Sequence, residues 1–541
     1  MAMQSPRLSW SGLSMPPIRH EAHYGDRIVR CFGDRPTRLH DLLERAAQRH
    51  GDNEAVVCGD TRLTWREVHD GAARLAGGLA SQGVSAGDRV VLFLSNRPEF
   101  VLALFAVQRL GAIAVPVGVR EQREGLSWIL DHCGARAVFL DGDLVTRLPQ
   151  DAAQTRLTIC CGPAGAELPA GMWRYETLAA WEQAPDVMPA QPEDVAVILY
   201  TSGTTGRPKG AMLTHLGIIH SVLHYLVTMD LTHLDRSLLA VPATHVTGLI
   251  ASVAAFAGAG GTLVLMPAFK ASTFLDVAEG ERITHTLMVP AMYQLLLLEP
   301  GFAQRRLDAW RIGGFGGAPM PVATIDALAK LWPGLHLLNA YGATETTSPT
   351  TLMPSGQIRD HADTVGVPLP CADVLVVDDE GREVAPGEVG EIWISGPMVV
   401  AGYWNNPEAT AREFTAGWWH SGDLGSIDAQ GYVRVFDRKK DMLNRGGYKI
   451  FSVEVENVLA RMPGVVEAAI VGKPCPVLGE RVHAFIYAPE ASVTLDQLRA
   501  FCVECLADYK VPESMTLTDQ PLPRNLNGKV LKRELRTQVP G

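Results

Sequence analysis

VAVILYTSGTTGRPKG, residues 195–210, joins an apolar strand to a loop that is rich in hydrogen-bond donors. The loop contains three glycines, four hydroxyl residues, Arg207 and Lys209. Glycine lets backbone amides approach an anion closely, hydroxyl groups donate further hydrogen bonds, and the two cations supply positive charge. The stretch therefore predicts a polyphosphate-binding loop after a buried strand, with a polar surface loop as the weaker alternative.

The loop differs from two widespread phosphate-binding patterns. A Walker A loop needs Gly-Lys-Ser/Thr, whereas Lys209 here precedes Gly210 and Ala211. A strand-linked G-x-G-x-x-G dinucleotide fingerprint is also absent from this stretch. The loop therefore matches neither of these patterns, and its donors and cations still predict polyphosphate binding.

Strands and helices alternate on both sides of this loop. Thr64 and Glu67 form the pattern of a capping box at the start of one helix. The other elements expected in this part of the chain are a helix over 39–50, short strands around the turn at 59–60, a strand over 90–94, a helix with Pro98 in its first turn, and a strand over 112–117. Strand–helix–strand units with apolar strands predict a mostly parallel sheet with helices on both faces. The pattern resumes over 195–338.

The texture changes after Thr364, where short strands such as 374–377 and 391–394 are separated by Asp, Gly and Pro. This part predicts a small β-rich subdomain. The charged run 437–441 then leads into a segment that we expect to fold as helix, strand, strand, helix, strand, with helices near 453–461 and 495–506. The fold class is therefore α/β, with a small α+β domain at the C-terminus.

Composition sets limits on the function. A chain of 541 residues predicts two or three domains, and 47% hydrophobic with 20% charged residues is typical of a globular protein. The net charge of -11 argues against a nucleic-acid surface, which needs clustered Lys and Arg. Nine scattered cysteines fit reduced thiols in the cytoplasm, and the lone Cys502–Cys505 pair is insufficient for a metal site.

No signal peptide is expected, because the N-terminus lacks a long apolar run. The uncharged stretch 246–269 is long enough to cross a membrane, but its glycines and Pro267 favour a buried helix through Phe256, a glycine turn and a strand over 262–266. We therefore expect a cytoplasmic protein without a transmembrane segment.

Residues 200–210, YTSGTTGRPKG, resemble the phosphate-binding loop of the adenylate-forming superfamily, which includes acyl-CoA synthetases, nonribosomal peptide adenylation domains and firefly luciferase. Six further matches follow in the expected order: GGAP at 316–319, YGATE at 341–345, HSGD at 420–423, DRKKD at 437–441, GGYKI at 446–450 and NGK at 527–529. The chain is identified by these motifs as a member of the superfamily, of the class I acyl-CoA synthetase type.

The resemblance implies a fold and an activity. The fold is a large N-terminal adenylation domain of doubly wound sheets with a β-rich subdomain over 1–437, a hinge at 438–441, and a small mobile C-terminal domain over 442–541. The activity is ligation of a carboxylic acid, fatty or aromatic, to coenzyme A (CoA). ATP and Mg²⁺ first convert the acid to an acyl-adenylate, because AMP leaves far more readily than oxide, and CoA then takes the acyl group. Pyrophosphate and AMP are released.

The resemblance also assigns nucleotide-binding residues. Glu345 positions Mg²⁺, and Thr344 donates to the α-phosphate. Tyr341 stacks on adenine, and Asp423 binds the ribose, since one carboxylate can accept from both hydroxyls. The β- and γ-phosphates contact Thr201, Ser202, Gly203, Thr204, Thr205, Gly206 and Lys209. The remaining nucleotide-binding residues are Gly317, Ala318, Pro319, Asn339, Ala340, Gly342 and Arg438.

Lys529 matches the catalytic lysine of the family, which bridges the attacking carboxylate and the α-phosphate during adenylation only. Lys440 matches the hinge about which the small domain rotates between the two half-reactions. Gly446 and Gly447 would line the pantetheine tunnel of CoA. No base is assigned to the thiol step, because a thiol attacks an activated anhydride readily.

The acyl pocket is implied with less detail. His245 matches a His or aromatic residue at the pocket mouth of relatives, and we count it among the catalytic residues. The pocket wall would comprise Val246, Thr247, Gly248, Phe315 and Gly316. These small and apolar residues suit an aromatic ring or an aliphatic chain, and no nearby basic residue favours a second carboxylate.

Three residues depart from the family pattern: Ser421 for Thr, Ser452 for Pro, and Asn525 for Thr. Two other functions are kept beside acid–CoA ligation: an adenylate-forming enzyme that loads a separate carrier protein, and a nucleotide-binding protein without activity. The expected partners are a small carboxylic acid, ATP and CoA, with no nucleic acid, and a homodimer is left open.

Overall fold

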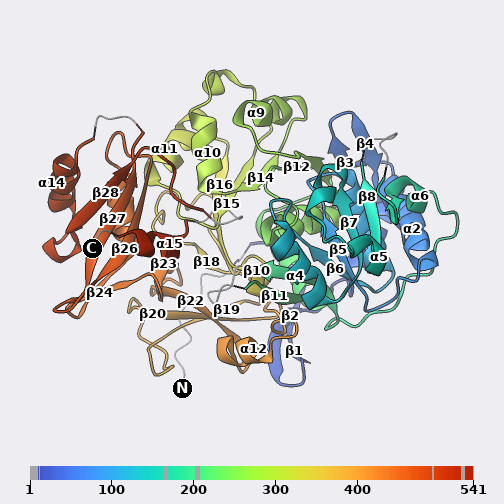
Figure 1. Cartoon of the computed structure of the whole chain (residues 1–541), viewed down its shortest axis with the longest axis horizontal. Coiled ribbons are helices and arrows are strands. Elements are labelled where there is room, and N and C mark those ends of the chain that lie inside the picture. The colour runs from blue at the N-terminus through green and yellow to red at the C-terminus, as the bar shows by residue number, and fades with distance from the viewer. Residues whose placement is uncertain are drawn as a thin grey trace. The chain divides into compact units, whose positions relative to one another are not determined.

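The computed structural model describes residue 10 and residues 12–162, 168–201, 207–489, 493–524 and 530–539. The chain forms two compact units (Figure 1). The large unit comprises Met1–Val374, Trp393–His420 and Gln430–Val433, and the small unit comprises Leu375–Ile392, Ser421–Ala429 and Arg434–Gly541.

A seven-stranded sheet in the large unit has the order β11-β10-β6-β5-β7-β8-β9. Its strands are β5 (Arg89–Phe93), β6 (Ile113–Pro116), β7 (Ala135–Asp141), β8 (Leu157–Cys161), β9 (Met172–Arg174), β10 (Val195–Thr201) and β11 (Lys209–Thr214). All pairs are parallel except β10 with β11, as the apolar strands predict. The helices between these strands are α3 (Pro98–Arg109), α4 (Arg123–Cys133), α5 (Ala152–Thr155) and α6 (Tyr175–Ala179).

A nine-stranded sheet has the order β18-β17-β16-β15-β14-β12-β13-β3-β4. Its strands are β3 (Glu54–Cys58), β4 (Thr61–Thr64), β12 (Arg236–Leu239), β13 (Thr262–Leu265), β14 (His285–Met288), β15 (Ile312–Gly316), β16 (His336–Tyr341), β17 (Thr351–Leu352) and β18 (Val367–Pro368). The six central strands pair in parallel, and the outer strands pair antiparallel. The associated helices are α1 (Leu39–His50), α2 (Trp65–Ser81), α7 (His215–Thr228), α8 (Ala255–Ala259), α9 (Ala271–Gly280), α10 (Pro290–Leu297) and α11 (Val322–Leu331).

The local predictions for this region are confirmed, with one difference. Helix α2 begins with the predicted capping box, in which the Glu67 amide donates to Thr64 Oγ1 at 3.2 Å and the Thr64 amide donates to Glu67 Oε2 at 2.8 Å. The predicted buried helix through Phe256 is instead a π-helix over Thr247–Ala254 that continues into α8. The backbone here packs so closely that a Cβ on Gly248 would lie 2.2 Å from the Pro242 oxygen.

Short strands follow the large sheets, as predicted. They are β19 (Asp373–Val377), β20 (Gly390–Ser395), β21 (Phe414–Thr415), β22 (Trp418–Ile427) and β23 (Val433–Arg438), with helix α12 (Pro407–Glu413) before β21. Strand β23 pairs with β22, and the order of the others is β19-β20-β22-β21. The boundary between the units passes through β19, β20, β22 and β23.

The rest of the small unit is a second five-stranded sheet with helices. It has the order β25-β24-β27-β26, with β28 paired to β27. The elements are β24 (Leu443–Arg445), β25 (Tyr448–Ile450), α13 (Ser452–Leu459), β26 (Glu467–Cys475), β27 (Gly479–Tyr487), α14 (Leu495–Cys505), β28 (Ser514–Thr518) and α15 (Lys532–Gln538). The predicted order of helices and strands is confirmed from α13 to β28, whereas the β24–β25 hairpin and α15 were not predicted. Buried apolar residues of β26, β27, α13 and α14 form its core.

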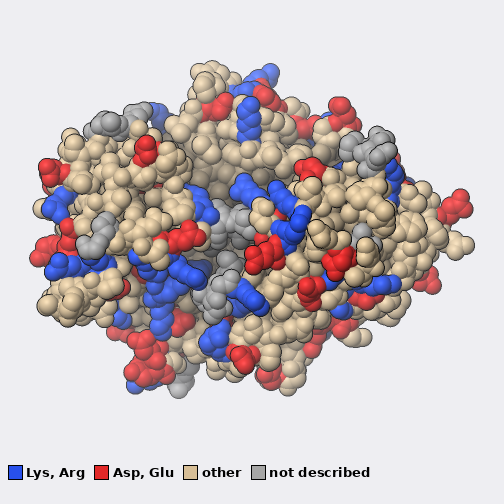
Figure 2. Space-filling model, viewed as in Figure 1, with Lys and Arg blue, Asp and Glu red and all other residues tan. Residues whose placement is uncertain are grey.

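Figure 2 shows Lys and Arg side chains interspersed with Asp and Glu side chains over the face in view. Among the described helices, none combines the length and the apolar composition that crossing a membrane requires.

Candidate active site

The predicted phosphate-binding loop connects β10 to β11. Thr201 and Lys209 are paired across these antiparallel strands, so both ends of the loop lie together. Thr201 Oγ1 lies 3.5 Å from the Lys209 oxygen and 3.5 Å from Glu345 Oε1. The predicted phosphate contacts at Ser202, Gly203, Thr204, Thr205 and Gly206 lie outside the described residues.

Glu345 lies on a single 3₁₀ turn, Thr344–Thr346, directly after β16. Thr344 and Glu345 are both buried, and the Glu345 backbone oxygen accepts a hydrogen bond from the Val400 amide at 2.9 Å. The next two residues, Thr347 and Ser348, have φ angles of 52° and 59°, which are unfavourable for side chains with a Cβ. Strained backbone of this kind occurs where surrounding contacts hold a side chain in a required place.

Lys209 is held by two residues that the motifs did not reveal. Its Nζ lies 2.5 Å from Glu413 Oε2 and 3.2 Å from the Tyr403 hydroxyl. The Tyr403 hydroxyl in turn lies 2.9 Å from Glu345 Oε1 and 2.7 Å from Glu413 Oε2. The predicted phosphate lysine and the predicted metal carboxylate therefore belong to one hydrogen-bonded cluster, which we call the Lys209 cluster (Lys209, Glu345, Tyr403 and Glu413).

The backbone explains how Tyr403 reaches this cluster. The Trp404 amide donates to the Gly210 oxygen at 2.7 Å, and the Met212 amide donates to the Gly402 oxygen at 3.0 Å. The segment around Tyr403 thus extends the ladder of β11, beside Lys209 at the end of the predicted phosphate-binding loop. Helix α12 follows directly and brings Glu413, its last residue, to the same place.

Burial shapes the charges in the Lys209 cluster. Burial and the two neighbouring carboxylates hold the pKa of the Tyr403 phenol well above its ordinary value. Burial alone would raise the pKa of Glu413, but its bonds with Lys209, Tyr403 and Arg412 bring that pKa below the ordinary value. The cluster therefore contains a neutral phenol beside an ionised Glu413.

The predicted adenine-binding residues lie at the carboxyl ends of two neighbouring parallel strands. Gly316 of β15 is opposite Ala340 of β16, and a Cβ on Gly316 would lie 2.3 Å from the Ala340 oxygen. Gly317 has a φ of +80°, and it is exposed together with Ala318 and Pro319. Carboxyl ends of parallel strands are where nucleotides bind in doubly wound sheets.

Neighbouring residues of the same motif are also at this edge. Tyr341 ends β16 and is half-buried, and Gly342 is exposed. Asn339 is buried, and its side-chain amide donates to the Thr364 oxygen at 3.2 Å. Asn339 therefore fixes the strand edge.

The predicted acyl-pocket residues form two groups, one after β12 and one at the end of β15. The first group follows β12 and leads into the π-helix; it comprises His245, Val246, Thr247 and Gly248. Short π-helical segments are frequent at functional sites. Phe315, which is 1% exposed, and Gly316 end β15. The two groups thus follow strands that are separated in the sheet by β14 alone.

The small unit brings the two predicted ribose-binding residues together. Arg438 Nε lies 3.2 Å from Asp423 Oδ1, and the Lys439 amide donates to the Gly422 oxygen at 2.8 Å. The Ser421 hydroxyl donates to the Ile392 oxygen at 2.6 Å and accepts from the Asp423 amide at 3.0 Å. The Ser421 hydroxyl therefore links the backbone of β20 to the backbone beside Asp423.

The predicted hinge is bonded to the C-terminal helix of the same unit. Arg536 donates to the Lys440 oxygen at 3.1 Å and to Asp441 Oδ1 at 2.9 Å. Burial lowers the pKa of the Lys440 amine. The Ser452 amide donates to Asp437 Oδ2 at 2.5 Å, a bond that a proline at 452 could not make.

Gly446 and Gly447 form the turn of the β24–β25 hairpin, in which Arg445 is opposite Tyr448. Their φ angles are +60° and +90°, so a two-residue turn of this hairpin requires glycine for conformational reasons. Lys529 lies outside the described residues. The residues that flank its loop are bridged, Arg524 with Val530.

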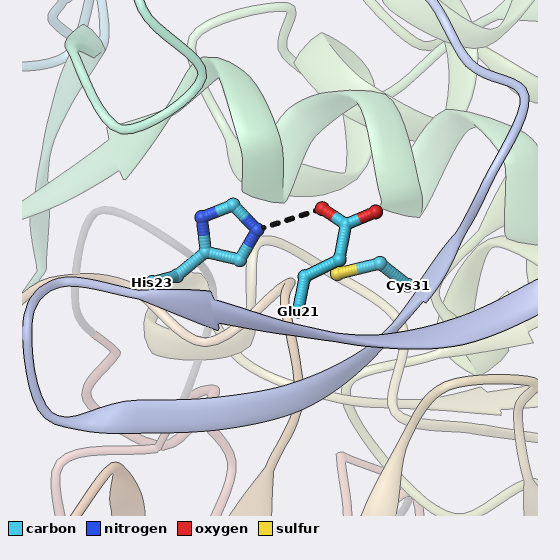
Figure 3. A group of neighbouring side chains, drawn as sticks. All are labelled: Glu21, His23 and Cys31. Atoms are coloured by element: carbon cyan, nitrogen blue, oxygen red, sulfur yellow. Dashed lines mark hydrogen bonds and ion pairs between the residues drawn. The ribbon is translucent and has the colours of Figure 1, made fainter.

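One further cluster outside these motifs, Glu21, His23 and Cys31, offers three metal-ligand types (Figure 3). Figure 3 shows their side chains on one face of the hairpin of β1 (Ile18–His23) and β2 (Arg27–Phe32). Glu21 is bonded to Arg35 at 2.6 Å, and both His23 nitrogens face carboxylates. Burial raises the pKa of the Cys31 thiol to about 12. These bonds occupy the ligand atoms of Glu21 and His23, so these two residues are better described as part of an ion-pair network.

Comparisons with known proteins agree with the motifs. Residues 43–404 match the family described as AMP-binding enzyme, and residues 454–529 match the AMP-binding enzyme C-terminal domain. A feruloyl-CoA synthase from Amycolatopsis sp is 38% identical over 495 residues, covering 91% of this chain and 97% of the relative. The fatty acid–[acyl-carrier-protein] ligase ScoC from Streptomyces coeruleorubidus is 34% identical, covering 92% of this chain and 95% of the relative.

A solved structure gives the same result. The o-succinylbenzoate coenzyme A synthetase (MenE) from Bacillus subtilis, in complex with ATP and a magnesium ion, superposes with a TM-score of 0.82 and 29% sequence identity. The match covers 92% of this chain and 99% of that chain.

Proposed function

Because the chain belongs to the AMP-binding enzyme family, we propose that it activates an apolar monocarboxylic acid with ATP and transfers the acyl group to CoA. The reaction class is AMP-forming acid–CoA ligation, in which an acyl-adenylate is the intermediate. One observation carries the proposal from the structure: Thr201, the last residue of β10, lies 3.5 Å from Glu345 Oε1, although the two residues are 144 positions apart. A cation and a buried carboxylate beside a donor-rich loop are what a metal–polyphosphate substrate requires.

The Lys209 cluster suits ATP that arrives with Mg²⁺. Among the described residues, both side-chain bonds to Glu345 reach Oε1, which leaves Oε2 as the oxygen for a cation. Carboxylate oxygen is the ligand that Mg²⁺ prefers, and one or two such groups suffice when phosphates supply others. Lys209 and Thr201 would bind the β- and γ-phosphates, and Thr344 would donate to the α-phosphate.

Adenylation joins two anions, so positive charge has to be placed where they meet. We assign this role to Lys529, which would bridge the acid carboxylate and the α-phosphate. Asp423 would hold the ribose hydroxyls and Arg438 would support it, because the two already form an ion pair at 3.2 Å.

Thioester formation follows in a second arrangement of the chain. We propose that residues 438–441 act as the hinge between a domain over 1–437 and one over 442–541, with Lys440 as the pivot. Gly446 and Gly447 would lie along the approach of the CoA thiol. No added base is needed, since the acyl-adenylate is already activated.

The acid is the least constrained part of the proposal. Relatives are named for ferulic acid and for fatty acids, and the residues assigned to the pocket wall, among them Phe315, are apolar or small. We propose an aromatic or fatty acid with one carboxylate. His245 would lie at the pocket entrance, at the start of the π-helix.

An acid panel tests this function. The purified chain is incubated with ATP, Mg²⁺ and single acids, with and without CoA, and pyrophosphate and thioester are measured. Pyrophosphate release that depends on an aromatic or fatty acid, with thioester formed only when CoA is present, is the expected result. The absence of acid-dependent pyrophosphate release would contradict adenylation, and would support a binding protein without activity.

Transfer to a carrier protein is the second candidate, because a relative named for that acceptor is 34% identical over 92% of this chain. A phosphopantetheinylated carrier protein replaces CoA in the same assay. Thioester on the carrier with none on CoA would make the carrier the acceptor.

We further propose a cytoplasmic location, which agrees with nine cysteines that are all free thiols. Cell fractionation with an antibody tests it, and recovery from an oxidising compartment would contradict it. Light scattering of the purified chain measures its mass in solution and tests whether it forms a homodimer.

A further inference from the structure

The phenol of Tyr403 lies between two carboxylates but has a single hydrogen to donate. Its oxygen is 2.9 Å from Glu345 Oε1 and 2.7 Å from Glu413 Oε2. Tyr403 is 2% exposed, and a phenol keeps its hydrogen at neutral pH. The phenol is therefore a neutral donor that satisfies one carboxylate at a time.

Lys209 determines which carboxylate needs that hydrogen. Its Nζ lies 2.5 Å from Glu413 Oε2, and Arg412 donates to Glu413 Oε1 at 2.7 Å. Glu413 is thus compensated by two cations, whereas no ion pair joins Glu345 to a cation within the described part of the chain. While Lys209 remains on Glu413, the hydrogen of Tyr403 is best placed on Glu345.

We propose that Tyr403 and Glu413 are positioning residues that couple phosphate binding at Lys209 to cation binding at Glu345. The inference rests on the proposed function, in which Lys209 binds the ATP phosphates. A polyphosphate carries several negative charges and draws Lys209 away from the single charge of Glu413. Glu413 then receives the phenol hydrogen, so that Oε1 of Glu345 becomes available, in addition to Oε2, for the Mg²⁺ that accompanies ATP. The O–H group of Tyr403 rotates, and no covalent bond breaks.

A fixed brace is the competing explanation of the same contacts. In that case Glu413 stays bonded to Lys209 and holds the ammonium group so that its other N–H groups point at the phosphates. The two explanations predict opposite signs when the charge of Glu413 is removed. If Lys209 has to leave Glu413 to bind phosphate, removing the Glu413 charge makes ATP binding stronger. If Glu413 instead holds Lys209 in place for the phosphates, removing that charge makes ATP binding weaker.

The test measures ATP binding to the full chain by calorimetry, once in EDTA and once in saturating Mg²⁺. In EDTA, Glu413→Gln should bind ATP about fivefold more tightly than the wild type, because no ion pair has to be exchanged. Mg²⁺ should increase the ATP affinity of Tyr403→Phe about fivefold less than it increases that of the wild type, because the phosphate and cation sites are no longer linked. Glu408→Gln removes the same charge from an exposed place on α12 and should change neither value.

Weaker or unchanged ATP binding by Glu413→Gln in EDTA would overturn the proposal, as would a full Mg²⁺ gain in Tyr403→Phe. Thermal unfolding of each variant checks the fold, and if Tyr403→Phe does not fold, the sign for Glu413→Gln decides alone. Failure of the proposed function and failure of the coupling give different results. A wild type that binds no ATP overturns both, whereas ATP binding without acid-dependent pyrophosphate release overturns the proposed function and leaves the coupling to be judged by these affinities.

Discussion

Nε of Arg438 lies 3.2 Å from Oδ1 of Asp423, and both residues come from the paired strands β22 and β23. Asp423 is 8% exposed, whereas the Arg438 side chain is 47% exposed. The exposed Arg438 orients the buried Asp423 carboxylate through this ion pair. When a ligand binds, the carboxylate can accept hydrogen bonds from the ligand's hydroxyls in place of part of the ion pair. This relationship makes the ribose assignment testable.

Asp423→Asn should raise the KM for ATP by about tenfold or more, because an amide oxygen accepts more weakly than a carboxylate and the ion pair with Arg438 is lost. Steady-state pyrophosphate release at varied ATP measures it. Asp428→Asn is the matched control, since Asp428 pairs with Arg434 at 3.2 Å in the same unit and has no assigned ligand. An equal rise in both variants would mean that the effect is structural.

Glu345→Gln should slow acid-dependent pyrophosphate release on the order of a hundred- to a thousandfold, because the buried turn would lose its negative charge toward Mg²⁺. The Mg²⁺ concentration that gives half-maximal rate should also rise. Glu504→Gln, at an exposed residue of α14, should leave both values unchanged. An unchanged Mg²⁺ requirement in Glu345→Gln would contradict the metal assignment.

Lys529→Ala should abolish pyrophosphate release but leave thioester formation from supplied acyl-adenylate largely intact. The expected loss in the first step is roughly a hundred- to a thousandfold, the usual effect of removing one preorganised charge. Lys473→Ala, a lysine of β26 in the same unit, serves as the control. Equal damage to both half-reactions would refute a role that is confined to adenylation.

Gly446→Ala should destabilise the small unit by about 1 kcal/mol, because alanine is unfavourable at a φ of +60°. Gly446→Asn should recover most of this free energy, since asparagine tolerates the left-handed region. If Gly446 also leaves room for CoA, the Asn variant should fold normally but show a raised KM for CoA. Urea unfolding and thioester kinetics separate the two effects, and a normal KM for CoA in the Asn variant would limit Gly446 to the turn.

The free energy of unfolding should fall as the pH drops from 7 to 5, because buried histidines must remain neutral in the folded chain. Burial lowers the pKa of His285 to about 3 from its ordinary 6.5. As the pH falls below 6.5, His285 is protonated in the unfolded chain but stays neutral in the folded chain. The free energy of unfolding therefore decreases. His285 alone accounts for about 2 kcal/mol between pH 7 and 5. Urea unfolding of His285→Leu should show a weaker pH dependence by that amount, whereas the exposed His336→Leu should match the wild type.

Residues close in sequence determined much of this protein without tertiary information. The helix over 39–50 and the Thr64–Glu67 capping box are confirmed, because a capping box and an apolar stripe depend on residues three or four apart. The loop after β10 and the motif around Glu345 were recognised in the same way. Each is a short run of residues whose chemistry can be read locally.

Contacts between distant segments were decided by the tertiary structure alone. Tyr403 and Glu413 reach Lys209 across 194 and 204 residues, and they do so because the segment around Tyr403 pairs with β11. The π-helix likewise depends on the close packing of Gly248 against Pro242. No local pattern contains either relationship, because backbone pairing and packing between remote segments form only when the chain folds. The sequence by itself therefore determined the reaction class and the residues that carry charge, whereas the fold decided which of those charges neutralise one another.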